Sequence, residues 1–242
     1  PATPEELRGL GWDRPDVTLV TGDSYIDSPL VGVSVIGQSL LKAGYRVGII
    51  AQPDITTADI TRLGEPALFW GVTGGCIDSL VANRPASGKK RREDDFTAGG
   101  INNRRPDRAV IVYANSIRRW FKATKPIVLG GIEASLRRIA HYDAWSNRVR
   151  RSVLIDAKAD LIVYGMGEIT VLELAARLKE GRPVSDLRGL CYIAAEKKQG
   201  TLELPSYEEA AADPSSFTKM FLGFYRNQDP LTAQALCQRQ DS

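Results

Sequence analysis

The sequence predicts an α/β protein with a Rossmann-like or flavodoxin-like open parallel sheet of about five strands, helices on both faces, and a C-terminal helical extension. Short apolar runs alternate with segments of helical periodicity, which is typical of parallel strands joined by crossover helices. Two of these runs, within residues 126–135 and 160–168, end in glycines followed by an acidic residue. Such an ending is typical of a tight turn from a buried strand into a helix.

The strands are expected where β-branched and aliphatic residues gather. They span residues 16–21, 46–51, 67–73, 127–129 and 161–164, with an edge strand at 190–194. The helices are expected where apolar residues recur three and four positions apart. They span residues 31–43, 55–63, 107–121, 133–142, 168–179 and 207–226.

Length and composition limit the architecture and the location. The chain has 242 residues and a net charge of +3, which suits one substantial α/β domain with appendages and does not by itself indicate a nucleic-acid partner. No apolar run is long enough to cross a membrane, and the first residues lack the features of a signal peptide. We therefore expect a cytoplasmic protein with no membrane partner, divided into an arm (1–15), a Rossmann-like domain (16–195), and a linker with a helix (196–242).

The candidate binding residues follow the predicted strands. Because the carboxyl ends of parallel strands meet at one edge of a sheet, ligands bind beyond that edge. The predicted cofactor-binding residues are Asp23, Ser24, Tyr25, Gly74, Gly75, Gly130, Gly131, Gly165, Gly167 and Glu168. Each also has a purely structural interpretation, since glycines permit tight turns and acidic residues stabilise helix starts. For Glu133 the structural interpretation is favoured, and we expect it to stabilise the start of its own helix.

The sequence offers neither a catalytic set nor a metal site. Cys76, Cys191 and Cys237 are not at metal-ligand spacing, and His141 is the single histidine. A lone histidine among apolar and aromatic neighbours is expected to be structural. We therefore predict no catalytic residue and no metal ligand in this chain.

Residues 83–106 interrupt the alternation of strands and helices. This segment contains four consecutive cations, residues 89–92, followed at once by Glu93, Asp94 and Asp95. A connection of this length inside a compact domain is usually functional or disordered. We expect the charged run to be a mobile loop.

Several motifs together resemble one known family. They lie at residues 21–27 (TGDSYID), 46–53 (RVGIIAQP), 106–108 (PDR), 130–138 (GGIEASLRR), 140–143 (AHYD) and 164–168 (YGMGE). From about Gly11 onward the chain resembles the N-terminal, cobalamin-binding-like region of YgiQ-type radical S-adenosylmethionine (SAM) proteins. Residues 27–29 read Asp-Ser-Pro where that family often has Asp-His-Pro, so a role for that histidine does not carry over.

The resemblance implies a domain order and a set of cofactors. A Rossmann-like region similar to cobalamin-binding domains would precede a radical SAM barrel, in the same or a partner chain. The barrel of that family carries a Cys-x-x-x-Cys-x-x-Cys motif for a 4Fe-4S cluster and binds S-adenosylmethionine; cobalamin is a further candidate cofactor. The cysteine motif is absent from this sequence, so the chain is expected to be inactive alone.

Two other functions fit the sequence. The first is a stand-alone nucleotide- or corrinoid-binding domain. The second is an RNA-binding module of an RNA-modifying enzyme, suggested by the arginine pairs at 118–119, 137–138 and 150–151 and by Arg148, with aromatic residues nearby. The resemblance favours the accessory domain of a radical SAM protein over both, with the reaction and the substrate unassigned.

Overall fold

The computed structural model describes residues 1–229 and 231–240. The chain divides into two compact units. The first comprises residues 1–138 and 154–192, and the second comprises residues 139–153 and the chain from residue 193 onward. The domain boundaries expected from the sequence stay a prediction.

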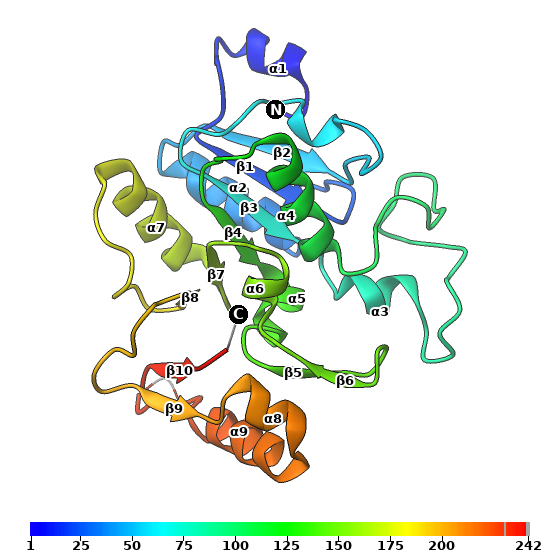
Figure 1. Ribbon diagram of the computed structural model, residues 1–242. Helices are drawn as coiled ribbons and strands as arrows, with labels where there is room; N and C mark the ends of the chain where they lie inside the picture. The colour runs from blue at the N-terminus through cyan, green and yellow to red at the C-terminus, as the bar shows by residue number, and fades with distance from the viewer. Residues whose placement is uncertain (230, 241–242) are drawn as a thin grey trace. The chain divides into compact units, whose positions relative to one another are not determined.

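The first unit is built on a six-stranded sheet with strand order β2-β1-β3-β4-β7-β8 (Figure 1). Its strands are β1 (Val17–Thr21), β2 (Val47–Ala51), β3 (Phe69–Thr73), β4 (Ile127–Gly130), β7 (Leu161–Val163) and β8 (Leu190–Tyr192). The first five in this list are parallel, and β8 pairs antiparallel with β7 at the edge. The five parallel strands follow the flavodoxin-like order, and the direction of chain winding reverses between β1 and β3.

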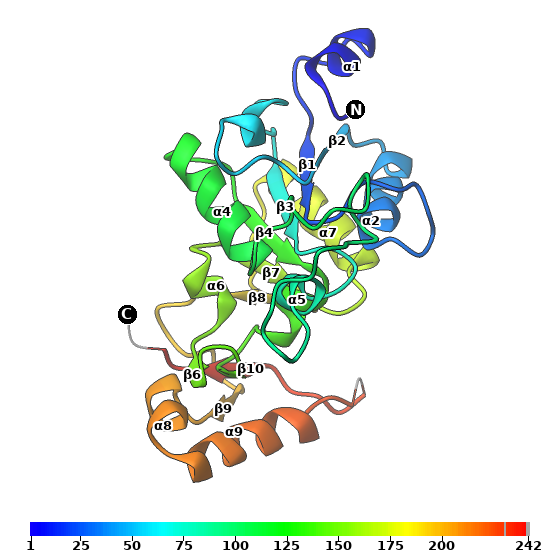
Figure 2. The same cartoon turned by 90° about the vertical axis from the view of Figure 1, so that its right-hand side faces the viewer.

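Both faces of this sheet are covered, as the apolar strands require. The first unit contains the 3₁₀ turn η1 (Asp59–Thr61) and the helices α1 (Pro4–Gly9), α2 (Gly32–Lys42), α3 (Ser79–Asn83), α4 (Ala109–Trp120), α5 (Gly131–Leu136), α6 (Val153–Asp156, whose first residue belongs to the second unit) and α7 (Glu168–Glu180). Helices α2 and α7 share one core with the strand residues Leu19, Phe69 and Val128. Helix α4 contacts β3 and η1 and lies on the other side of the sheet from α2 (Figure 2). The predicted α/β fold with helices on both faces is confirmed.

The second unit has its own small core. The strands β5 (His141–Asp143) and β6 (Arg148–Arg150) form a hairpin, while β9 (Leu202–Leu204) and β10 (Leu236–Gln238) pair in parallel. Helices α8 (Tyr207–Ala212) and α9 (Pro214–Arg226) complete the unit, with Leu204, Ala210 and Met220 at its centre. The predicted helical extension is thus part of a mixed α/β unit.

Three predicted helices differ from the structure. The helix expected at 133–142 ends at Leu136, because residues 141–143 pair with a strand that follows seven positions later. The helix expected at 55–63 is reduced to the 3₁₀ turn η1. The helix expected at 207–226 is broken at Asp213, since Pro214 lacks an N–H and disfavours a helical residue before it.

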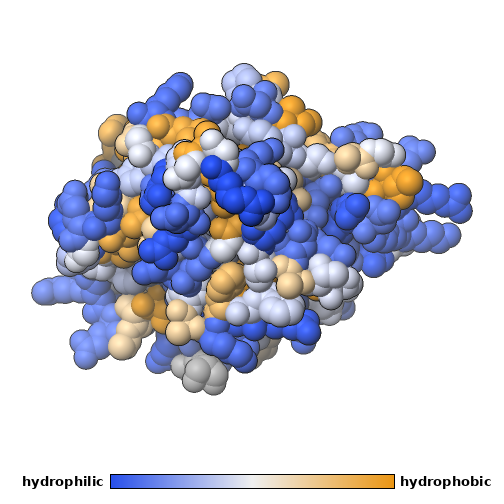
Figure 3. Space-filling view, turned by 90° about the horizontal axis from the view of Figure 1, so that it is seen from above, coloured by the Kyte–Doolittle hydropathy of each residue, from blue (hydrophilic) through white to orange (hydrophobic). Residues whose placement is uncertain are grey.

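The surface of the molecule is largely hydrophilic where Figure 3 shows it, with small hydrophobic patches between the polar side chains. Across the described residues, no helix has the length and apolarity needed to span a bilayer.

Candidate functional site

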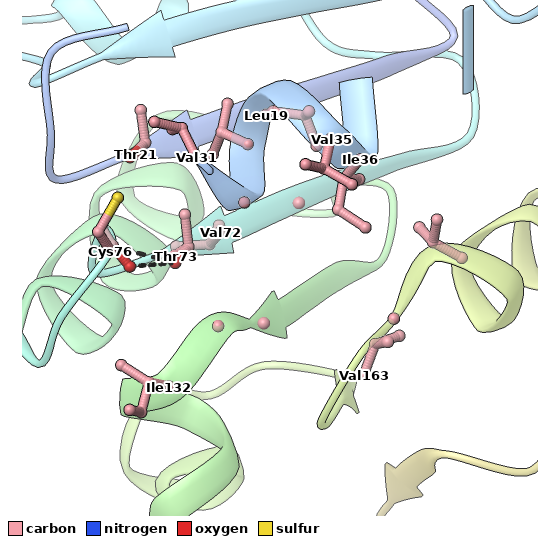
Figure 4. A pocket seen from close by; sticks show the side chains of 18 of the residues that line it. Leu19, Thr21, Val31, Val35, Ile36, Val72, Thr73, Cys76, Ile132 and Val163 are labelled. Atoms are coloured by element: carbon pink, nitrogen blue, oxygen red, sulfur yellow. Dashed lines mark hydrogen bonds between the residues drawn. The ribbon is translucent and has the colours of Figure 1, made fainter. Parts of the chain in front are cut away.

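A cavity of about 400 Å³ lies in the first unit, at the carboxyl edge of the sheet. Its walls are the ends of β1, β3, β4 and β7 together with the first turns of α2 and α7. Figure 4 shows Val35 and Ile36 of α2 on one side of the cavity and Val163 of β7 on the other. The cavity thus includes the β1/β3 switch point, where this sheet topology is expected to place a ligand.

The lining is apolar and carries no cation. Aliphatic side chains such as Leu19, Val72 and Val163 form most of the wall. The charged lining residues are Asp23 and Glu168, and the lining contains no lysine, arginine or histidine. A cavity of this size and chemistry suits an apolar, uncharged group, whereas a phosphate inside it would meet two carboxylates and no positive side chain.

At several positions the cavity wall is formed by glycines, which present no side chain. Gly130 has an extended backbone with φ −151°, and a Cβ there would come no closer to other atoms than 3.7 Å from the Val163 carbonyl oxygen. Gly131 and Gly75 are different, because their φ angles are +77° and +118°. A Cβ would also lie 2.4 Å from Thr73 Oγ1 or 2.2 Å from Asp23 Oδ1, respectively. A side chain at Gly130 would therefore project into the cavity at little cost, while Gly75 and Gly131 are required by the backbone.

The cavity brings most of the predicted site residues together. Those that line it are Asp23, Gly75, Gly130, Gly131, Gly165, Gly167 and Glu168. Ser24, Tyr25 and Gly74 do not line it. The Ser24 hydroxyl donates to Gln52 and accepts from the Ala98 N–H, Tyr25 is 40% exposed, and Gly74 lies against Glu133. A binding role for all ten stays a prediction.

Glu133 caps two helices other than its own. Its side chain is buried, and its carboxylate accepts from Ser79 N (2.9 Å), in the first turn of α3, and from Val110 N (3.3 Å), in the first turn of α4. Burial raises the pKa of this carboxyl group, and the hydrogen bond from Ser79 opposes that rise. Glu133 lies in the first turn of α5, as expected, and its carboxylate in addition holds α3 and α4 to the strand ends.

A buried ion-pair cluster joins residues 83–106 to the end of β1. Arg105 Nη2 lies 2.7 Å from Asp23 Oδ1 and 3.1 Å from Asp94 Oδ2, and the Arg105 side chain is 0% exposed. Nearby, Gln52 Nε2 donates to Thr97 Oγ1 (2.6 Å). Neither Arg105 nor Asp94 is among the site residues predicted from the sequence. The charged run that was expected to be a mobile loop has two of its own residues held in place, since Asp94 pairs with Arg105 and Arg91 N donates to Asn83 O (2.7 Å).

Cys76 lies in the cavity wall. Its backbone N–H donates to Asp23 Oδ2 (2.6 Å). Burial, together with the negative charge of Asp23, raises the pKa of the Cys76 thiol to about 11. The thiolate is the reactive form, so Cys76 is not an activated nucleophile at neutral pH.

The remaining residues considered for catalysis or metal binding form no reactive cluster with the cavity residues. All three cysteines are free. His141 lies in β5 of the second unit, where its Nδ1 is 3.2 Å from Ile139 O. Over residues 1–229 and 231–240, no three His, Cys, Asp or Glu side chains are grouped so that they could hold a metal ion.

Known proteins similar to this chain define its family. The family described as "Radical SAM N-terminal" matches residues 1–242. A UPF0313 protein of Fusobacterium nucleatum is 54% identical over 243 residues, which cover 100% of this chain and 43% of the relative. A UPF0313 protein of Thermotoga maritima is 52% identical with the same coverage of both chains, and one of Methanocella arvoryzae is 49% identical over 98% of this chain and 40% of the relative.

Among solved structures, the radical S-adenosylmethionine methyltransferase TsrM from Kitasatospora setae, with cobalamin and a [4Fe-4S] cluster bound, matches with a TM-score of 0.48 and 22% identity. The match covers 74% of this chain and 29% of TsrM. The chain spans less than half the length of the UPF0313 relatives it matches. The chain belongs to the radical SAM N-terminal family, and over its whole length it is similar to part of the UPF0313 proteins.

Proposed function

We propose that this chain is the accessory cofactor-binding domain of a radical SAM protein, and that its cavity receives the apolar end of a corrinoid. The observation that carries the proposal is the glycine-walled, cation-free cavity of about 400 Å³ at the β1/β3 switch point. The nucleotide tail of cobalamin ends in a flat, uncharged benzimidazole, which suits this lining. Its phosphodiester is negatively charged and is therefore expected outside the lining.

The residues of this chain would bind and orient the cofactor. The Asp23 carboxylate is committed to Arg105 and to the Cys76 N–H, so it shapes the wall and has little capacity left for a ligand. Glu168, at the start of α7, also lines the cavity, and in the described part of the chain its carboxylate has no hydrogen-bond or ion-pair partner. Glu168 would accept hydrogen bonds from the amide side chains of a corrinoid ring.

The chemistry would come from the remainder of the longer protein. Family membership and the length of the relatives support a radical SAM barrel with a 4Fe-4S cluster, which this sequence lacks the cysteine motif to hold. A cluster of this kind, if held by that barrel, would supply the one electron needed for reductive cleavage of S-adenosylmethionine. In this proposal the present chain contributes binding and has no catalytic residue of its own.

The structure favours this function over RNA binding. Arg118 pairs with Asp160 at 2.8 Å, and Arg137 pairs with Asp78. Arg138 lies over the Tyr164 ring, 4.6 Å from its centroid. Three of the arginines that suggested an RNA surface are thus engaged within the fold.

A titration of hydroxocobalamin into the chain tests the proposal, followed by visible spectroscopy and isothermal calorimetry. We expect saturable one-to-one binding. Flavin mononucleotide is the comparison ligand, because its phosphate would meet the carboxylates of the lining. Absence of heat and of any spectral change with hydroxocobalamin would refute the corrinoid assignment, and tight binding of the flavin would contradict the charge argument.

A further inference from the structure

Arg105 occupies a fully buried position where residues 83–106 meet the end of β1. Its guanidinium donates through Nη2 to Asp23 Oδ1 (2.7 Å) and through Nε to Gly22 O (3.0 Å). The second carboxylate on Nη2 is that of Asp94, and the Phe96 ring centroid lies 5.8 Å from the guanidinium carbon. A buried guanidinium is tolerated only with such a set of partners, so each of these contacts fixes where the side chain lies.

Asp23 connects Arg105 to the cavity wall through hydrogen bonds. While Oδ1 accepts from Arg105, Oδ2 accepts from the Cys76 N–H at 2.6 Å. The Gly75 backbone lies against the same carboxylate so closely that a Cβ at Gly75 would be 2.2 Å from Oδ1. Gly75 and Cys76 both line the cavity, whereas Arg105 does not.

The aliphatic part of the Arg105 side chain also packs at the point where the loops after β1 and β3 meet. A Cβ at Gly22 would lie 2.2 Å from the Gly74 carbonyl oxygen and 3.2 Å from Arg105 Cγ. The loops after β1 and β3 are thus in backbone contact beside the arginine. A lysine would keep the charge but would lose the forked geometry that serves Gly22 and Asp23 together.

We infer that Arg105 is a positioning residue for the cavity: from outside the lining, it fixes through Asp23 the wall formed by Gly75 and Cys76. Residues 83–106 are then a structural part of the binding site. The consequence for affinity rests on the proposed function, but the consequence for the wall can be measured without any ligand.

The test is the rate at which iodoacetamide alkylates Cys76, read by mass spectrometry of the digested chain. The reaction forms a sulfur–carbon bond, iodide leaves, and the thiol proton passes to solvent. In Arg105→Lys we expect the rate at Cys76 to rise about tenfold or more, because the wall opens more often. Cys191 in the same molecule is the internal reference, and its rate should stay unchanged.

Arg84→Lys is the matched control. Arg84 also anchors this segment, through Asp107 (2.7 Å) and Gly88 O (2.8 Å), but among the described residues no hydrogen bond or ion pair joins either partner to Asp23. Its substitution should leave Cys76 at the wild-type rate. An equal rate at Cys76 in Arg105→Lys and Arg84→Lys, or a rise that Cys191 shares, would overturn the inference.

A second variant keeps the test decisive if Arg105→Lys does not fold. Asp94→Asn retains Arg105 and the volume of the side chain at position 94, but it removes the charge that pairs with the guanidinium. Arg105 is then held less firmly, so Cys76 should be alkylated faster than in wild type. An unchanged rate in folded Asp94→Asn would count against the inference.

Hydroxocobalamin affinity should fall about tenfold in Arg105→Lys and not in Arg84→Lys. A Cys76 response in a chain that binds no cobalamin would uphold the positioning role and refute the corrinoid proposal.

Discussion

Replacing Gly74 with alanine should displace the buried carboxylate that joins α3 and α4 to the sheet. A Cβ at Gly74 would lie 2.2 Å from Glu133 Oε2 and 3.0 Å from Glu133 Cδ, well inside the normal contact distance. Glu133 has little room to retreat, since it is only 2% exposed. The substitution should therefore break the bond from Ser79 N and strain the bond from Val110 N.

The expected cost follows from those two hydrogen bonds. A hydrogen bond to a charged group contributes about 1.5–3 kcal/mol, so loss of one bond and weakening of the other predicts a decrease of about 2–5 kcal/mol in the free energy of unfolding. Urea denaturation would show this as a lower midpoint with an unchanged slope. Gly9→Ala is the matched control, because a Cβ at the end of α1 meets nothing within 4 Å.

A double-mutant cycle identifies the cause. If the alanine methyl acts through the carboxylate, Gly74→Ala should cost much less in a Glu133→Ala background than in wild type. A cost that is the same in both backgrounds would refute this reasoning. So would a Gly74→Ala protein within about 0.5 kcal/mol of wild type.

Two further substitutions test the electrostatics and the caps. Burial raises the pKa of the Glu133 carboxyl group above its ordinary value of 4.5, so the folded state binds the proton more tightly than the unfolded state. The free energy of unfolding of wild type relative to Glu133→Gln should therefore fall as the pH rises from about 4.5 through the raised pKa; a difference that stays constant between pH 4 and pH 7 in chemical denaturation would contradict this. Asp213 accepts from Ser215 N and Ser216 N at the start of α9, so Asp213→Ala should destabilise the chain by about 1 kcal/mol in thermal denaturation. Asp213→Asn should retain most of that stability, and equal losses in the two variants would argue against the cap.

Local patterns were sufficient to predict the sheet and the edge where the cavity lies. The strands and their glycine turns are encoded within a few residues, as in the run from Ile127 to Gly131. The break at Asp213 was also readable, because Asp followed by Pro is a helix-start signal that the periodicity of residues 207–226 concealed. The β5–β6 hairpin was harder to anticipate, since its signals are three-residue strands and a turn at Asn147, whose φ is +47°.

The parts of the site that were missed depend on contacts between distant residues. Asp23 and Arg105 are 82 residues apart, and no local pattern around Arg105 distinguishes it from the neighbouring Arg104. Glu133 looked like a helix-start residue for α5, and only the packed fold shows that its carboxylate reaches α3 and α4. The carboxyl edge of the sheet could therefore be predicted from the sequence, whereas the side chains that hold this edge together could not.

The most direct test of the central claim compares hydroxocobalamin binding by wild type and by Gly130→Val. The extended backbone at Gly130 accepts valine without strain, and the new side chain would enter the cavity beside Val163. We predict saturable one-to-one binding of hydroxocobalamin to wild type and none to Gly130→Val. Both proteins should be folded and should unfold at the same denaturant midpoint. Equal affinity in the two proteins would contradict the claim that this cavity is the cofactor site.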